Sequence, residues 1–200
     1  FLCVARFVKQ KNQFFLIKAF ERLLSRNSNL NLKLVLVGDG PLLNSCKNYV
    51  EKKRLGQRVI FPGVQKEVGK YYLQSDVFVL PSLYEGFPNV LLEAMMYHLP
   101  IISSDCDFGP SELLSQGEFG LLYNGSINDL VEKMEYLFPV EKRIYFSNQS
   151  RIRIADYLPS RCNAHQEVNK LLCSCLISKI EVNAVMDLLD AHSLCVGIQL

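Results

Sequence analysis

Two glutamates separated by seven residues are the strongest candidates for chemistry in this sequence. Glu85 follows an apolar segment at 77–80, and Glu93 lies on a helix that is expected over 88–97. At a rise of about 1.5 Å per residue, Glu93 stands about 7.5 Å along the axis from the helix start. Carboxylates at this separation, with backbone N–H groups at the helix start between them, suit an anionic ligand that carries several hydroxyl groups. The alternative is an exposed loop acid and an exposed helix acid that share this spacing by chance.

A basic loop near the start of the chain could meet the charge of such a ligand. Arg6, Lys9 and Lys11 stand between an apolar segment at 1–5 and a helix expected over 13–26. Cations beside a helix N-terminus favour a phosphate group, because the helix dipole already attracts an anion there. A solvated basic loop without a ligand is the alternative.

Gly38 and Gly40 form a second candidate loop, between an apolar segment at 32–37 and a helix expected over 42–55. Glycines at such a place let the backbone approach a ligand closely, as in dinucleotide-binding folds, although the third glycine of that fingerprint is absent. A tight turn with no ligand is the alternative.

Short apolar segments alternate with helical patterns along most of the chain. Strands are expected at 1–5, 32–37, 59–61, 77–80, 100–103 and 120–123, and further helices at 68–75, 111–114, 127–137, 140–150 and 160–176. Buried strands separated by helices predict an α/β fold with a doubly wound parallel sheet, whose ligands bind beyond the carboxyl ends of the strands. We expect a domain over 1–158 and a C-terminal helical tail over 159–200.

The composition narrows the class of partner and the cellular setting. A net charge of +2, from 22 basic and 20 acidic residues, provides no broad basic field, so nucleic acid is not expected as a partner. The sequence has no apolar run of about 18 residues and no signal pattern, which predicts a soluble protein. Seven scattered cysteines without a C-x-x-C pair argue against a zinc site or a disulfide framework and favour a reducing, cytoplasmic setting.

Other titratable residues do not predict a metal site. His98 and His165 have no ligand partners at a recognisable spacing, so structural roles are expected for both.

The segment from Glu85 to Met95, Glu-Gly-Phe-Pro-Asn-Val-Leu-Leu-Glu-Ala-Met, closely resembles the paired-glutamate motif of retaining GT-B glycosyltransferases of the group 1 family, also called glycosyltransferase family 4-like. Other segments agree in order and spacing: Ala5-Arg6 with Lys11-Asn12, Val37-Gly38-Asp39-Gly40-Pro41, Val59-Ile60-Phe61-Pro62-Gly63, the run from Ser75 to Ser82, and Gly109-Pro110-Ser111-Glu112. Ala5 and Asn12 stand where that family commonly has glycine. The resemblance implies the Rossmann-like, C-terminal, donor-binding half of a GT-B fold.

The resemblance also implies a role for each candidate residue. Arg6 and Lys11 would contact the donor diphosphate, Glu85 the transferred sugar and Glu93 the ribose. The catalytic residues would then be Glu85, Arg6 and Lys11, and the donor-binding residues Gly38, Gly40, Gly63, Val64, Gly86, Phe87, Pro88, Asn89 and Glu93. Of these, Gly63 and Val64 would border the base, and residues 86–89 would supply backbone N–H groups to phosphate or sugar.

The activity that the resemblance implies is transfer of a hexose or N-acetylhexosamine, with retention, from a nucleoside diphosphate sugar to a glycan or lipid-linked acceptor. The donor is expected to be UDP-linked, and no cofactor is expected. Because GT-B enzymes usually stabilise the leaving diphosphate with cations and helix N-termini, the resemblance also implies that Asp105 and Asp107 are not an Asp-x-Asp metal motif and that no metal is bound. The acceptor would lie mainly against an N-terminal domain that is absent from this chain, so the chain alone is expected to be inactive. A peripheral association of the full protein with the inner face of a membrane stays open. The alternatives are a non-catalytic sugar-nucleotide binding module and a GT-B sugar-nucleotide epimerase.

Overall fold

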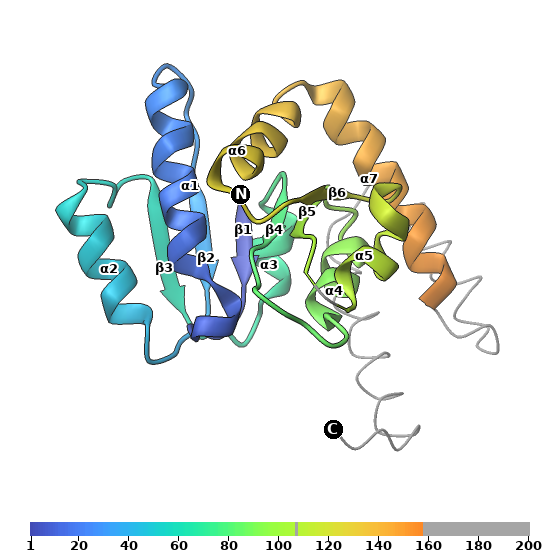
Figure 1. Cartoon of the computed structure of the whole chain (residues 1–200), viewed down its shortest axis with the longest axis horizontal. Helices are drawn as coiled ribbons and strands as arrows, with labels where there is room; N and C mark the ends of the chain where they lie inside the picture. The colour runs from blue at the N-terminus through green and yellow to red at the C-terminus, as the bar shows by residue number, and fades with distance from the viewer. Residues whose placement is uncertain (107, 158–200) are drawn as a thin grey trace. The chain divides into compact units, whose positions relative to one another are not determined.

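Six parallel strands form one sheet in the order β3-β2-β1-β4-β5-β6 in the computed structural model (Figure 1). The strands are β1 Leu2–Val4, β2 Leu34–Val37, β3 Val59–Gly63, β4 Phe78–Leu80, β5 Ile101–Ser104 and β6 Leu121–Tyr123. This sheet confirms the predicted parallel α/β class. Successive strands add outward from β1 in one direction and from β4 in the other, so the space between β1 and β4 is a topological switch point, the place where ligands bind in such folds.

The structure describes residues 1–106 and 108–157. Residues Phe1–Ile154 form one compact unit, and the second unit begins at Ala155. The helix predicted over 160–176, His165 and Asp107 lie outside the described residues, and the boundary at 158 stays a prediction. None of the helices in the described ranges combines the length and hydrophobicity needed to cross a bilayer.

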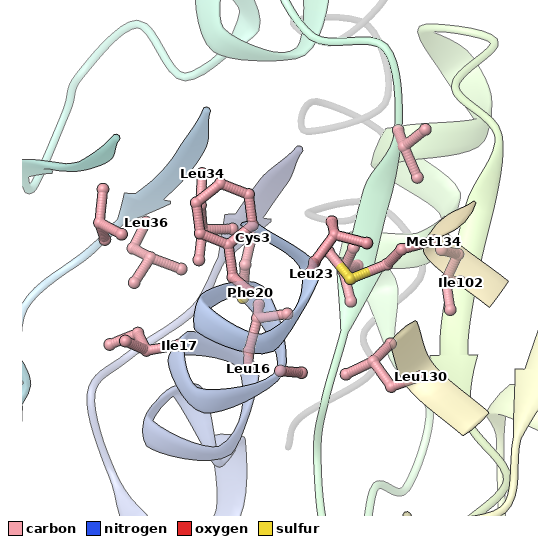
Figure 2. Packing of buried hydrophobic residues seen from close by; sticks show 14 of the residues in the cluster. Cys3, Leu16, Ile17, Phe20, Leu23, Leu34, Leu36, Ile102, Leu130 and Met134 are labelled. Atoms are coloured by element: carbon pink, nitrogen blue, oxygen red, sulfur yellow. The ribbon is translucent and has the colours of Figure 1, made fainter. Parts of the chain in front are cut away.

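Helices α1, α2 and α6 cover one face of the sheet. The helices of this unit are α1 Gln13–Arg26, α2 Leu43–Lys52, α3 Gly69–Leu73, α4 Asn89–Met96, α5 Pro110–Leu113, α6 Ile127–Tyr136 and α7 Val140–Ile154, with 3-10 turns η1 Lys9–Lys11 and η2 Ser115–Gly117. Leu16, Phe20 and Leu23 recur at helical spacing on α1, and Figure 2 shows them directed at the strands. Because all three are fully buried, this face is a continuous apolar core.

Helix α3 covers the opposite face, behind the sheet in the view of Figure 1. Val77 and Val79 belong to the core cluster under α1, whereas the ring of Phe78 stacks on Tyr72 of α3 with centroids 5.7 Å apart. Successive side chains of a strand point to opposite faces, so α3 and α1 must lie on opposite sides of β4. The sheet is therefore doubly wound, as predicted.

Several helix ends differ from the prediction, among them one end each of α2, α4 and α7. Helix α2 ends at Lys52, before the expected stop at Gly56, because Arg54 takes a left-handed conformation (φ 56°) and Leu55 N–H bonds to Val50 O in a Schellman closure. Helix α4 begins at Asn89, so Pro88 precedes the helix and does not occupy its first position. Helix α7 continues to Ile154, which is buried.

Candidate functional site

The loop after β1 is shaped by one buried aromatic residue. Phe7 is fully buried, its N–H donates to Asp39 O (2.8 Å), and its carbonyl accepts from Leu42 N–H (3.0 Å). With Phe7 turned inward, the preceding Arg6 is exposed, and its guanidinium has no hydrogen bond or ion pair with the described part of the chain. The buried Gln13 fixes the backbone beneath it by donating from Nε2 to Arg6 O at 2.9 Å. Arg6 is thus a free cation on an anchored loop.

Gly38 and Gly40 let the loop after β2 press against the loop after β1. A Cβ atom on Gly38 would stand 2.2 Å from Ala5 O, and one on Gly40 would stand 2.5 Å from Phe7 O. Both distances are far inside van der Waals contact. In this structure the two glycines allow the close approach of one loop to the other, and the donor contact expected for them stays a prediction.

An ion pair joins the loop after β1 to the loop after β4. Lys11 Nζ lies 2.6 Å from Glu85 Oε1, although the two residues are 74 positions apart in the sequence, and their side chains are 22% and 6% exposed. Glu85 is therefore not an exposed loop acid. Gln10 holds the same two loops together: its Nε2 donates to Tyr84 O (2.9 Å), and its carbonyl accepts from Leu83 N–H (2.8 Å). These contacts stand at the switch point between β1 and β4.

Asn12 ends the η1 turn with a left-handed backbone, φ 51°. Asparagine tolerates this region better than most residues with a Cβ atom, so it can stand where the family that the sequence resembles commonly has glycine. Lys11 is the last residue of η1, and Asn12 alone separates it from the start of α1.

The start of α4 supplies fewer backbone donors than the sequence led us to expect. Pro88 has no N–H, and Asn89 N–H donates to Phe87 O at 3.0 Å across a turn centred on Pro88. A Cβ atom on Gly109 would stand 2.2 Å from Gly86 O, so the loop after β5 packs directly on this turn. The turn from Gly86 to Asn89 is thus fixed by its own bonds and by its neighbour.

Glu93 lies on α4 and is partly buried. Tyr72 donates its hydroxyl to Glu93 Oε2 at 2.8 Å, and the Tyr72 side chain is itself buried. Glu93 therefore differs from the exposed helix acid of the alternative interpretation. Its carboxylate is held by a hydroxyl from α3.

Gly63 and Val64 stand where β3 ends. Gly63 takes φ 77°, and its carbonyl accepts from Gly38 N–H at 3.0 Å. Val64 is 74% exposed, so an apolar surface is open to solvent next to the loop after β2.

Two titratable groups near these residues are unsuited to acid–base or nucleophilic chemistry. Burial raises the pKa of the Cys3 thiol to about 12, with smaller opposing effects from Lys11 and Glu85, so the thiol is neutral at neutral pH. Burial, and then the charge of Arg151, lower the pKa of His98 to about 4. His98 takes φ 55° and closes α4 through its N–H to Met95 O, which supports the structural role predicted for it.

Three residues that hold the site together were missed from the sequence, namely Gln10, Gln13 and Tyr72. Each acts through a side-chain hydrogen bond to a distant or loop residue, and no sequence pattern marks such a bond. Among the described residues, no group of three His, Cys, Asp or Glu side chains is placed to hold a metal ion.

Residues 1–152 match the family model described as glycosyl transferases group 1. This chain belongs to that family. The group 1 match confirms the family to which the paired glutamates pointed.

Relatives of this group 1 chain are longer than it is. An uncharacterized glycosyltransferase of Methanocaldococcus jannaschii is 40% identical over 114 residues, which cover 57% of this chain and 28% of the relative. The N-acetylgalactosamine-N,N'-diacetylbacillosaminyl-diphospho-undecaprenol 4-alpha-N-acetylgalactosaminyltransferase of Campylobacter jejuni is 30% identical over 154 residues, which cover 76% of this chain and 41% of the relative. The chain thus spans less than half the length of each.

The fold of this group 1 chain also matches solved structures. TarM of S. aureus, in complex with fondaparinux, alpha-GlcNAc-glycerol and UDP, matches with a TM-score of 0.73 at 22% identity. The match covers 84% of this chain and 34% of TarM. The likeness confirms the predicted Rossmann-like half of a GT-B fold.

Proposed function

We propose that this chain is the donor-binding half of a retaining glycosyltransferase and holds a nucleoside diphosphate sugar at the carboxyl edge of the sheet. The observation that carries the proposal is the contact of Lys11 with Glu85 at the switch point between β1 and β4. At this point a cation that could bind phosphate, Lys11, contacts a carboxylate that could bind hydroxyl groups, Glu85. Arg6 extends the positive charge, and Glu93 follows on the adjoining helix.

In this proposal the cations act on the leaving group. The bond between the anomeric carbon and the diphosphate oxygen breaks, and a bond forms from that carbon to an acceptor oxygen, whose proton passes to the departing diphosphate. Arg6 and Lys11 stabilise the negative charge that grows on the diphosphate, and stabilisation of this kind is often the largest contribution to catalysis. Glu85 binds the hydroxyl groups of the transferred sugar, and Glu93 binds the ribose.

The remaining donor-binding residues complete the proposed site. Gly63 and Val64 border the base, and Val64 offers it an exposed apolar surface. Gly86 and Phe87 supply N–H groups to phosphate or sugar, while Pro88 and Asn89 shape the turn. Gly38 and Gly40 bring the loops after β1 and β2 together around the ligand.

We propose UDP as the nucleotide, a hexose or N-acetylhexosamine as the sugar, and a glycan or lipid-linked acceptor. TarM, which shares the fold, was crystallised with UDP and alpha-GlcNAc-glycerol, and the Campylobacter relative is named for a sugar transfer onto a diphospho-undecaprenol carrier. The acceptor would lie mainly against an N-terminal domain, so the described half is expected to bind donor without turnover. The full protein would work on the cytoplasmic side, where peripheral contact with a membrane would bring it to lipid-linked acceptors.

We expect the chain to bind UDP in the absence of divalent metal, because cationic side chains and backbone N–H groups meet the diphosphate in this proposal. Calorimetric titration with UDP in EDTA and in MgCl₂ tests this, with uridine as the control ligand. At 100 times the dissociation constant, UDP should stabilise the chain by about 2.7 kcal/mol in a thermal-shift measurement. Binding that disappears in EDTA, or UDP affinity no higher than uridine affinity, would contradict the proposal.

A further inference from the structure

Tyr72 is a buried residue of α3 whose hydroxyl group reaches a residue of the candidate site on α4. The side chain is 1% exposed, and its ring is stacked on Phe78 and on Tyr97, with centroids 5.7 and 5.0 Å away. The Tyr72 and Tyr97 rings are nearly parallel, at 7°. A ring held on two aromatic neighbours cannot swing to another rotamer, so the position of its hydroxyl is fixed by packing.

This fixed hydroxyl donates to Glu93. The distance from Tyr72 Oη to Glu93 Oε2 is 2.8 Å. Burial raises the pKa of Tyr72 above its ordinary value, and the neighbouring Glu93 charge raises it further. The hydroxyl therefore keeps its proton at neutral pH and acts as the donor in this bond.

A glutamate on a helix surface ordinarily samples many rotamers, and ordering it costs up to about 2 kcal/mol of side-chain entropy. The bond to Tyr72 orders the Glu93 carboxylate before any ligand arrives. Preorganised groups bind more tightly because this cost is not incurred on binding.

We propose that Tyr72 is a positioning residue of the donor site, which orients Glu93 to accept a hydrogen bond from the ribose of the nucleotide. The inference rests on the proposed function, because Glu93 is the residue that would bind ribose there. Tyr72 acts through Glu93 and does not itself touch the ligand. A purely structural hydroxyl would affect stability and leave the recognition of ribose unchanged.

Tyr72→Phe isolates the hydroxyl, since phenylalanine keeps the ring and both stacking contacts. The chain contains a matched control in Tyr49 of α2, whose hydroxyl donates to Glu21 Oε2 of α1 at 2.5 Å. Tyr49→Phe deletes the same kind of bond away from the candidate site. Glu93→Gln gives the full loss of the charged acceptor for comparison.

The measurement is the ratio of affinities for UDP and for its 2′-deoxy and 3′-deoxy analogues, by calorimetry on each variant of the full chain. We expect Tyr72→Phe to weaken the affinity for UDP about three- to tenfold, as for one lost hydrogen bond. The affinity for the deoxy analogue that the wild type binds more weakly should stay nearly unchanged. The discrimination ratio should fall toward that of Glu93→Gln, and Tyr49→Phe should keep the wild-type ratio.

Three results would overturn the inference, and they are distinguishable. If Tyr72→Phe keeps the wild-type ratio of affinities, whether or not all three ligands bind more weakly, the positioning role alone is overturned. If the wild-type chain binds UDP and both deoxy analogues equally well, the binding of ribose by Glu93 is overturned. A wild-type chain with no UDP affinity overturns the proposed function itself.

Discussion

Replacing Lys11 with alanine is expected to weaken UDP binding by roughly 10- to 100-fold, since a charge-assisted bond contributes about 1.5 to 3 kcal/mol. The ammonium group of Lys11 is the cation at the switch point, in contact with Glu85. Uridine carries no phosphate, so its weaker affinity should change little. Titration of the variant with UDP and uridine measures both.

Lys9→Ala is the matched control for this prediction. Lys9 belongs to the same η1 turn and is exposed, and its ammonium group has no ion pair among the described residues. Lys9→Ala removes the same charge from the loop as Lys11→Ala does. The loss of UDP affinity in Lys9→Ala therefore measures the long-range electrostatic contribution, which salt screens. Equal losses in the two variants would contradict a direct contact of Lys11 with phosphate, and equal losses for UDP and uridine would indicate a damaged fold.

Gly38→Ala is expected to destabilise the chain by about 2 to 6 kcal/mol, a large part of the roughly 5 to 15 kcal/mol that typical domains possess. The backbone of Gly38 has φ 134°, which residues with a Cβ atom rarely adopt, and the new methyl group would meet Ala5 O at 2.2 Å. The neighbour is backbone of the central strand region and cannot move aside as a side chain would. Urea denaturation gives the free energy of unfolding.

Gly56→Ala provides the comparison for Gly38→Ala. Gly56 lies in the turn after α2, and a Cβ atom there would meet nothing within 4 Å. This variant should be neutral or slightly stabilising, because alanine reduces the entropy of the unfolded chain. Similar stabilities of the two variants would show that the loops after β1 and β2 separate easily, which is contrary to the packing described above.

Much of the fold could be predicted because it follows from local patterns. Helix α1 runs over 13–26 as the apolar spacing indicated, and each predicted strand overlaps an observed one. The end of α2 could not be predicted, because Arg54 accepts a left-handed conformation that glycine ordinarily takes. Sheet order was also beyond the local patterns, since it depends on which strands pair across long stretches of chain.

The sequence predicted which residues belong to the candidate site better than it predicted the contacts between them. The motif and the resemblance pointed to Lys11 and Glu85, but their contact joins residues 74 positions apart and exists only because β1 and β4 are neighbours. Tyr72 was not predicted, because a buried tyrosine on a short helix looks like core sequence until its hydroxyl is seen to reach Glu93. Of residues 86–89, Pro88 has no N–H group and the Asn89 N–H is bonded to Phe87 O, and the donor contacts expected for this turn stay a prediction.

The most direct test of the proposed donor site is to titrate Glu85→Gln and Glu93→Gln with UDP and with UDP-glucose or UDP-N-acetylglucosamine, whichever the wild type binds more tightly. Glu93→Gln should weaken UDP and the UDP-sugar alike, because both contain ribose. Glu85→Gln should leave UDP affinity unchanged or raise it, because Lys11 no longer has to leave Glu85 to meet phosphate, and should weaken only the UDP-sugar. Two variants with the same pattern of losses, or with no change for either ligand, would contradict the assignment of one glutamate to ribose and the other to sugar.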